Sequence, residues 1–145
     1  MAYYTKNGAE LEGDYAAYSG TDGTCSYNAS KGKINTTGAG YINVTPQNPD
    51  QMKAALANQT VSVSLCASHR DFQYYTSGIL TSTHCGTQLD HAVLLVGWGI
   101  ENGTEYWVVK NSWAADWGDQ GYIRFAIVSG KGICGVQMEP VYPTL

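Results

Sequence analysis

The sequence predicts a mainly β, α+β fold with antiparallel strands, and three observations lead to this prediction. Two β-prone runs, HAVLLVGWG (residues 91–99) and TEYWVVKNSW (residues 104–113), flank an Asn-Gly pair that favours a tight hairpin turn. The runs VSVSLCAS and GYIRFAIV alternate apolar with polar or small residues, as half-buried strands do. Helix signals are clear in one segment, and residues 1–32 are rich in the Gly, Ser, Asp and Asn of loops.

The helix is expected within residues 45–59, TPQNPDQMKAALANQ. Asn48 can cap its first turn, and Pro49 fits the first helical position, where no backbone N–H is needed. One apolar face follows, formed by Met52, Ala55 and Leu56. We also expect a strand around Ile34 to Val44 and a short helical turn in RDFQYYTSG.

The composition excludes several classes of function. The 145 residues suit one domain, and 43% hydrophobic with 14% charged residues is the composition of a globular chain. The net charge of −4, without a run of Lys or Arg, argues against nucleic acid or an anionic membrane as a partner. No apolar stretch approaches the roughly 18 residues that span a bilayer, and the N-terminus lacks the apolar core of a signal peptide.

The cysteines leave the disulfide pairing open, and the Asn-x-Ser/Thr sequons conflict with the N-terminus about the compartment. The four cysteines allow three fully paired connectivities, and because no CxxC pair occurs we expect no zinc site. Five sequons favour an exported, glycosylated protein, at Asn28, Asn35, Asn43, Asn58 and Asn102. The missing signal peptide conflicts with export, unless the N-terminal part of the gene product is absent from this sequence.

The expected hairpin brings His91 close to Asn111 and Trp113 at its open end, within a register slip of about two residues. A histidine that acts as a base needs an acceptor on its second ring nitrogen, and an Asn carbonyl provides one without adding charge. That arrangement suits a thiolate–imidazolium pair, and an indole nearby can shield the hydrogen bond from water. The alternative is a histidine at the end of a strand with a polar or core role.

Several motifs occur in one order along the chain: GTDGTCSYNAS, QMKAALANQTVSVSL, RDFQYYTSGI, CGTQLDHAVLLVGWG, EYWVVKNSWAADWGDQGYIRF and GICGV…YPTL. In these motifs the sequence resembles the papain-like cysteine peptidases of the cathepsin L type, over essentially its whole length. The resemblance implies an antiparallel, barrel-like right-hand domain at residues 33–145. It also implies that residues 1–32 are a mostly loop-like remnant of the helical left-hand domain.

The resemblance also assigns roles to particular residues. It implies that His91 is the catalytic histidine, that Asn111 orients it, and that Trp113 covers their hydrogen bond. Trp117 resembles the aromatic wall on the leaving-group side, while Cys85 and Cys134 match a disulfide and Cys25 matches a half-cystine paired upstream. The substrate side chain would be bound by Ser64, Leu89, Asp90, Ala92 and, at the bottom of the pocket, Glu139.

Glu139 raises a question of specificity, since most relatives of this type carry a small or apolar residue at that position. A carboxylate at the bottom of an apolar pocket can pair with an arginine. We therefore expect the intact enzyme to accept Arg as well as Leu or Phe there. The alternative is that Glu139 points to solvent.

The nucleophile of the family lies in a Cys-Gly-Ser-Cys-Trp type of segment that this sequence does not contain. Cys25 lies in a loop without a helix N-terminus to lower its pKa, and Cys66 lies in a strand, where a free Cys is usually a buried hydrophobe. The sequence thus predicts the C-terminal part of a cysteine endopeptidase, inactive alone. The alternative is a non-catalytic homologue that acts as a binding or structural protein.

The expected partners follow from this prediction. They are a peptide or protein substrate and a missing helical half, or another chain, that covers the cleft wall. No cofactor, metal, nucleic acid or membrane is expected. The family resemblance and the sequons together place the protein in a lysosome or vacuole or outside the cell.

Overall fold

The computed structural model describes residues 3–32, 34, 36 and 39–144, and its contacts divide the chain into two compact units. The smaller unit comprises residues 1–42 and 143–145, and the larger unit comprises residues 43–142. The division follows residue 42, whereas the sequence led us to expect a boundary after residue 32, and the position of the domain boundary stays a prediction. None of the helices within these described ranges is long and apolar enough to cross a membrane.

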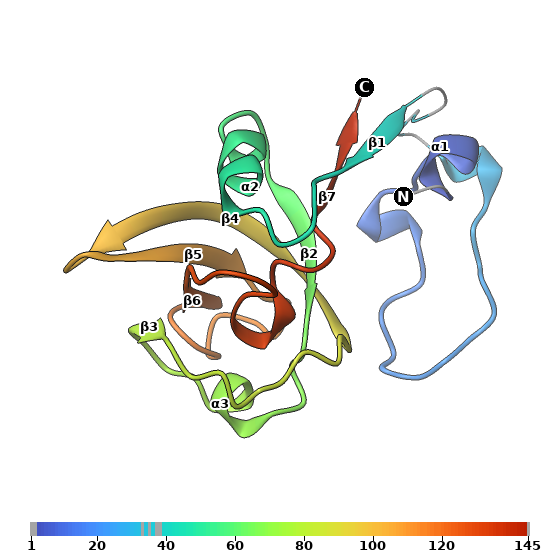
Figure 1. The fold of residues 1–145 in the computed structure, drawn as a ribbon. Coiled ribbons are helices and arrows are strands. Elements are labelled where there is room, and N and C mark those ends of the chain that lie inside the picture. Colours follow the sequence, from blue (N-terminus) through green and yellow to red (C-terminus); the bar gives the residue numbers. More distant parts are fainter. Residues whose placement is uncertain (1–2, 33, 35, 37–38, 145) are drawn as a thin grey trace. The chain divides into compact units, whose positions relative to one another are not determined.

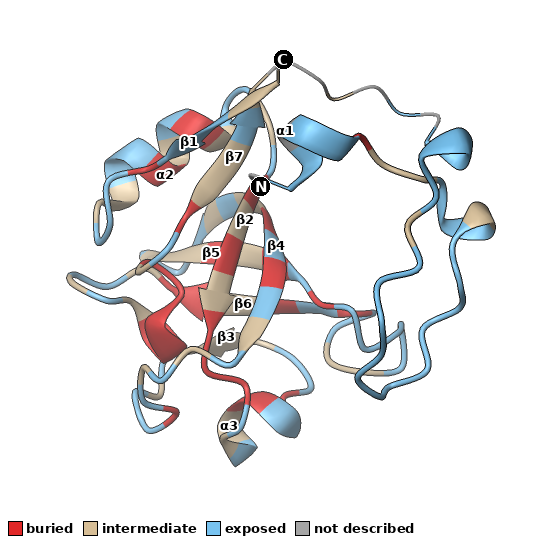
Figure 2. Ribbon diagram, turned by 90° about the vertical axis from the view of Figure 1, so that its right-hand side faces the viewer, coloured by how far each residue is buried: buried red, intermediate tan, exposed pale blue. Residues whose placement is uncertain are grey.

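The smaller unit is mostly loop between short elements, as its turn-forming composition leads one to expect. It contains α1 (Tyr4–Asn7), the 3₁₀ turns η1 (Glu12–Asp14) and η2 (Ala29–Lys31), and most of β1 (Gly40–Asn43). Most of its described residues are exposed (Figure 2). The strand expected around residues 34–44 is thus confined to β1, and residues 33, 35, 37 and 38 lie outside the described ranges.

The larger unit is built on an open sheet with few helices (Figure 1). Its elements in chain order are α2 (Pro49–Leu56), β2 (Val61–Leu65), α3 (Arg70–Gln73), β3 (Ile79–Leu80), β4 (His91–Glu101), β5 (Thr104–Lys110), β6 (Tyr122–Ala126), η3 (Ile133–Gly135) and β7 (Val141–Thr144), of which β7 continues into the smaller unit. The strand order is β7-β2-β4-β5-β6-β3, with β3 parallel to β6. This mainly antiparallel sheet confirms the predicted fold class, although the sheet is not closed into a barrel within the described residues.

Helix α2 forms where its capping signals predict. The Asn48 side chain accepts a hydrogen bond from the Gln51 N–H, and Pro49 occupies the first turn. Met52 and Ala55 are buried, so the apolar face packs against the sheet. Strand β2 alternates buried and half-buried residues along its length, which confirms the period-two pattern of VSVSL.

Strands β4 and β5 form the long hairpin that the Asn102-Gly103 pair predicts (Figure 1). Both turn residues have positive φ, 50° and 80°, which a type I′ turn requires and which Asn and Gly adopt most readily. The pairing runs from Glu101 opposite Thr104 to Gly97 opposite Val108, then shifts by one residue before Leu95 opposite Val109. This bulge leaves one extra residue in β4, which the sequence analysis did not predict.

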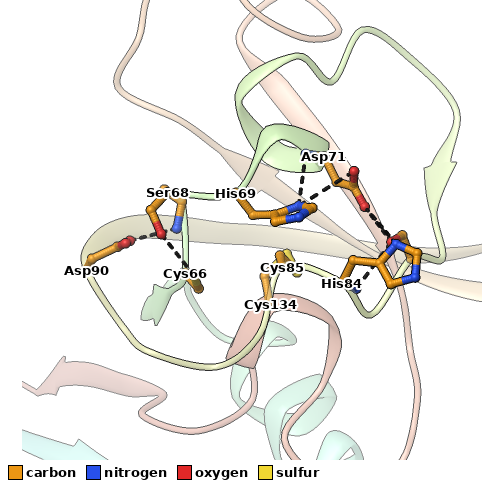
Figure 3. The surroundings of a disulfide bond; sticks show 10 residues. Cys66, Ser68, His69, Asp71, His84, Cys85, Asp90 and Cys134 are labelled. Atoms are coloured by element: carbon orange, nitrogen blue, oxygen red, sulfur yellow. Dashed lines mark hydrogen bonds and ion pairs between the residues drawn. A yellow bond between two sulfur atoms is a disulfide. The ribbon is translucent and has the colours of Figure 1, made fainter.

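The core of the larger unit consists of apolar side chains from the sheet, α2, α3 and η3. The largest fully buried ones are Trp107, Phe72, Phe125, Met52, Leu65, Leu95, Ile123 and Ile133. A disulfide joins Cys85, in the loop before β4, to Cys134 in η3, and confirms the pairing that the family resemblance implied (Figure 3).

Gln137 is a fully buried polar residue in this core. Its Oε1 accepts a hydrogen bond from the Trp107 Nε1–H at 3.1 Å, and its Nε2 donates to the carbonyls of Val128 and Gly130 at 2.9 and 2.8 Å. Because an indole N–H can only donate, the orientation of the Gln137 amide is fixed. The side chain thus ties the loop after β6 to the centre of β5.

We predict that Gln137→Leu lowers the free energy of unfolding by about 3 kcal/mol, because it leaves the buried Trp107 N–H without a partner and removes hydrogen bonds to two partly buried carbonyls. Urea unfolding followed by tryptophan fluorescence measures the change. Gln73→Leu, at an exposed position, is the matched control and should stay within about 0.5 kcal/mol of the unsubstituted chain. Equal effects of the two substitutions would contradict the prediction.

Candidate active site

His91 and Asn111 are in direct contact at the open end of the β4–β5 hairpin. His91 is the first residue of β4 and is paired with Leu65 of β2, while Asn111 directly follows β5. The His91 Nε2 lies 2.8 Å from the Asn111 Oδ1, which is a hydrogen-bond distance. Asn111 is only 7% exposed, so this hydrogen bond is largely removed from water.

The backbone of Ser112 determines the orientation of this pair. Its N–H donates to the same Asn111 Oδ1 at 2.8 Å, and a backbone N–H can only donate. The atom facing both groups must therefore be the amide oxygen, and the His91 Nε2 must carry a proton to bond with it. The neutral imidazole is then left with an unprotonated Nδ1, the nitrogen available to accept a proton.

Three further features concern Asn111 itself. Its backbone N–H donates to the Gly121 carbonyl at 2.9 Å, which fixes the start of the loop between β5 and β6. Its Nδ2 is buried and forms no hydrogen bond within the described part of the chain. Asn111 also lines a hollow of about 330 Å³, together with Ser62, Ala92, Val93, Leu94, Lys110 and Ser112.

The Trp113 indole covers the histidine. Its ring centroid lies 5.2 Å from that of His91, with the ring planes inclined by 33°. Trp117 meets Trp113 edge to face at 5.5 Å, and its Nε1–H donates to the Gln73 carbonyl at 3.1 Å. Both tryptophans thus lie on one aromatic wall beside His91, and Trp113 remains 38% exposed.

Phe72, in helix α3, supports this wall from within the core, and the sequence analysis missed it. Its fully buried ring lies 5.3 Å from Trp113, 5.0 Å from Trp117 and 6.1 Å from His91, measured between centroids. The segment RDFQYY was expected only to form a helical turn. A single Phe in an otherwise polar turn is the signal that could have identified it, because such a residue must be buried against something.

Asp90 holds a turn in place, and its expected role in substrate binding stays a prediction. Its carboxylate accepts a hydrogen bond from the Ala67 N–H at 2.6 Å. This bond, the hydroxyl and N–H of Ser68 and the nearby His91 together lower the pKa of Asp90 below its usual value. The carboxyl group faces Ser68 in Figure 3, at the point where the chain leaves β2.

The residues expected to bind the substrate side chain are only partly brought together. Ser64 and the exposed Glu139 line one hollow of about 400 Å³, with Asn43, Val44, Pro46, Ser62, Met138, Pro140 and Val141. Ala92 pairs with Ser64 across β2 and β4 but does not line this hollow. Leu89 does not line this hollow, but it lies near Met138, which does. A Cβ added at Gly135 would meet the Leu89 Cδ2 at 2.8 Å and the Met138 Sδ at 3.1 Å.

Two cysteines of the described residues remain free, Cys25 in the smaller unit and Cys66 in the larger. Cys25 is exposed, and hydrogen bonds from the Tyr27 N–H and the Tyr3 hydroxyl lower its pKa, a cause that the sequence analysis did not consider. Cys66 is buried, as expected, but it directly follows β2 instead of lying in the strand, and its Sγ is 3.4 Å from the Ser68 hydroxyl. Within the described ranges, no group of three or more His, Cys, Asp or Glu side chains is arranged to hold a metal ion.

Sequence comparison supports one family. A sequence model described as papain family cysteine protease matches residues 1–144. The cysteine proteinase RD21A of Arabidopsis thaliana is 44% identical over 144 residues, which covers 97% of this chain and 30% of the relative. Vignain of Ricinus communis is 44% identical over 132 residues, which covers 89% of this chain and 35% of the relative. The chain thus spans about a third of the length of these curated relatives.

Solved structures agree with the sequence comparison. The bromelain protease from Ananas comosus, solved in complex with the E64 inhibitor, has a TM-score of 0.86 at 40% identity, covering 99% of this chain and 66% of the bromelain chain. Procathepsin L 3 from the larval midgut of Tenebrio molitor has a TM-score of 0.86 at 28% identity, covering 99% of this chain and 46% of that protein. The chain therefore belongs to the papain family of cysteine proteases.

Proposed function

We propose that the chain supplies the histidine–asparagine half of a cysteine endopeptidase. The observation that carries this proposal is the hydrogen bond between the His91 Nε2 and the Asn111 Oδ1, with the amide oriented by the Ser112 N–H. A peptidase that uses a thiol nucleophile needs such a base, held in one tautomer by a neutral acceptor. His91 and Asn111 are the catalytic pair in this proposal, and Trp113 and Trp117 support them.

The His91 Nδ1 accepts the proton of a cysteine thiol, and the thiolate attacks the carbonyl carbon of the scissile peptide bond. When the C–N bond breaks, the imidazolium returns the proton to the leaving amine and a thioester remains. His91 then accepts a proton from water, which attacks the thioester carbon and releases the carboxylic acid and the thiol. Asn111 keeps the ring in position throughout, because its carbonyl binds the Nε2–H in both charge states.

The nucleophilic cysteine is proposed to come from a helical segment or chain outside these 145 residues. Cys25 matches a family half-cystine by resemblance and Cys66 is buried beside Ser68, so neither is proposed as the nucleophile. The chain alone is accordingly proposed to be inactive. The partly exposed Trp113 belongs to the wall that the missing half would cover.

The compartment of this peptidase is proposed to be a vacuole or lysosome, or the extracellular space. One relative, 41% identical over 143 residues, is named as a KDEL-tailed cysteine endopeptidase of Arabidopsis thaliana. A KDEL tail is a retention signal for the endoplasmic reticulum, so that relative enters the secretory route. The Cys85–Cys134 disulfide also fits an oxidising compartment.

Glu139 is proposed to select an arginine side chain of the substrate. It lines the same hollow as Ser64, and its carboxylate is free to approach a guanidinium there. Because Glu139 is exposed, water screens its interaction with the substrate arginine and limits how much that interaction stabilises the complex. Leucine and phenylalanine side chains would still be accepted through the apolar residues of the hollow.

The proposed activity can be tested with a chimera in which this chain replaces the matching residues of the bromelain protease, which would then contribute the remaining third. We predict peptide hydrolysis that E64 inhibits, and a loss of about 10²- to 10⁴-fold in kcat/KM for His91→Ala, because the general acid and base is removed. His84→Ala, at a side chain 81% exposed, is the matched control and should retain activity.

The same measurement on the chain alone should give no hydrolysis. Comparable activity of the chain alone would refute the proposed division of the catalytic residues. A chimera that is folded but inactive would instead favour a non-catalytic homologue.

The proposed tautomer makes a separate prediction that needs no enzyme activity. The ¹⁵N chemical shifts of neutral His91 should show a proton on Nε2 and none on Nδ1, because the Ser112 N–H fixes the Asn111 oxygen toward the ring. Asn111→Ala should yield a mixture of both tautomers. A proton on Nδ1 in the unsubstituted chain would contradict the assignment.

The specificity proposal predicts that Glu139→Ala, made in the chimera, lowers kcat/KM for a substrate with Arg two residues before the scissile bond by about tenfold. The matched substrate with Phe at that position should be unaffected. Glu139→Gln preserves the shape and removes the charge, so it should reproduce the loss for Arg. Unchanged turnover of the Arg substrate in both variants would show that Glu139 points to solvent.

A further inference from the structure

Three of the four sequons in the described residues have an asparagine with a local structural role. The Asn28 Oδ1 accepts hydrogen bonds from the N–H and hydroxyl of Ser30, and the Asn58 Nδ2 donates to the Ala54 carbonyl at 3.2 Å. Asn102 occupies the first of the two positive-φ positions of the hairpin turn, where asparagine is favoured because it adopts this backbone conformation readily. Turn and cap chemistry therefore accounts for these three asparagines without any modification.

Asn43 differs, because local structure gives no reason for it. It is the last residue of β1, and asparagine is depleted in strands. Its side chain is exposed and makes no hydrogen bond to the described residues. Asn43 is therefore unfavourable for the strand, and no side-chain hydrogen bond to the described residues offsets this.

The extended backbone also presents the Asn43 sequon to solvent. Val44 is 5% exposed and donates its N–H to the Pro140 carbonyl at 2.9 Å, so it anchors the middle of the triplet. Asn43 and Thr45 are both exposed on the opposite side, since side chains alternate along an extended chain. The acceptor amide and the threonine hydroxyl that a sequon requires thus lie on one accessible face.

Asn43 lines the hollow that also contains Ser64 and Glu139. We propose that Asn43 carries an N-linked glycan and that its first sugars lie at the mouth of this hollow. In the modification, Nδ2 bonds to the anomeric carbon of a lipid-linked oligosaccharide diphosphate, the carbon–oxygen bond to the diphosphate breaks, and Nδ2 loses a proton. The glycan then narrows access to Ser64 and Glu139 and disfavours long substrate side chains, a consequence that rests on the function proposed above.

The modification is tested by secreting the full chain from yeast, with an Asn-Ala-Thr tag at its C-terminus to report that the host glycosylates it. Enzymatic deglycosylation in ¹⁸O-labelled water converts each glycosylated Asn to a labelled Asp, which mass spectrometry detects by position. We expect label at residue 43, its loss in Thr45→Val and its retention in Thr45→Ser. A labelled tag with an unlabelled residue 43 would overturn the proposal.

Access to the hollow is tested separately from catalysis. In a Cys25→Ser background, Glu139→Cys is reacted with a polymer-linked maleimide before and after deglycosylation. We expect the glycan to slow this reaction roughly tenfold, because an N-glycan is bulky. Tyr74→Cys, at a position 75% exposed in the α3 region, should react equally in both forms.

The two tests fail independently. Equal rates at residue 139 on a glycosylated chain would overturn the control of access, whether or not the protein is a peptidase. Failure of the chimera to hydrolyse peptides would overturn the proposed effect on substrate side chains. It would not affect the proposal that Asn43 carries a glycan.

Discussion

The bulge between Leu95 and Gly97 determines which side chains of the β4–β5 hairpin share a face. Between the turn and the bulge, Glu101 pairs with Thr104 and the register continues to Gly97 opposite Val108. Beyond the bulge, toward the open end, the register of β4 is shifted by one residue, so that Leu94 pairs with Lys110. Without the shift, Asn111 would lie opposite Leu94, on the face of the sheet that His91 does not occupy. With the shift, Asn111 lies diagonally across from His91, close enough for a hydrogen bond.

The contact that results is held by main-chain groups as much as by side chains. The Gly121 carbonyl fixes the Asn111 backbone, and the Ser112 N–H fixes its amide. A neutral acceptor aligns the imidazole without the strong preference for its charged form that a carboxylate would impose. Asp90, the adjacent carboxylate, is instead engaged with the Ala67 N–H, so its charge is partly satisfied by the backbone.

The sequence was sufficient wherever one short-range rule decided the outcome. Asn48 capped α2, the Asn102-Gly103 pair closed the hairpin, and the family resemblance identified the partner of Cys85. It was insufficient where tertiary packing decided. The bulge in β4 has no local signature, and the burial of Gln137 depends on Trp107 across the core.

Phe72 has a consequence for how this part of the family can change during evolution. Its ring contacts the core through Phe125 and the aromatic wall through Trp113 and Trp117. A substitution at any of these positions therefore changes the packing of the others. The changes in the free energy of unfolding caused by paired substitutions will not be additive. We therefore expect a change at one of these rings to be accompanied by compensating changes at its neighbours, in the wall and in the core beneath it.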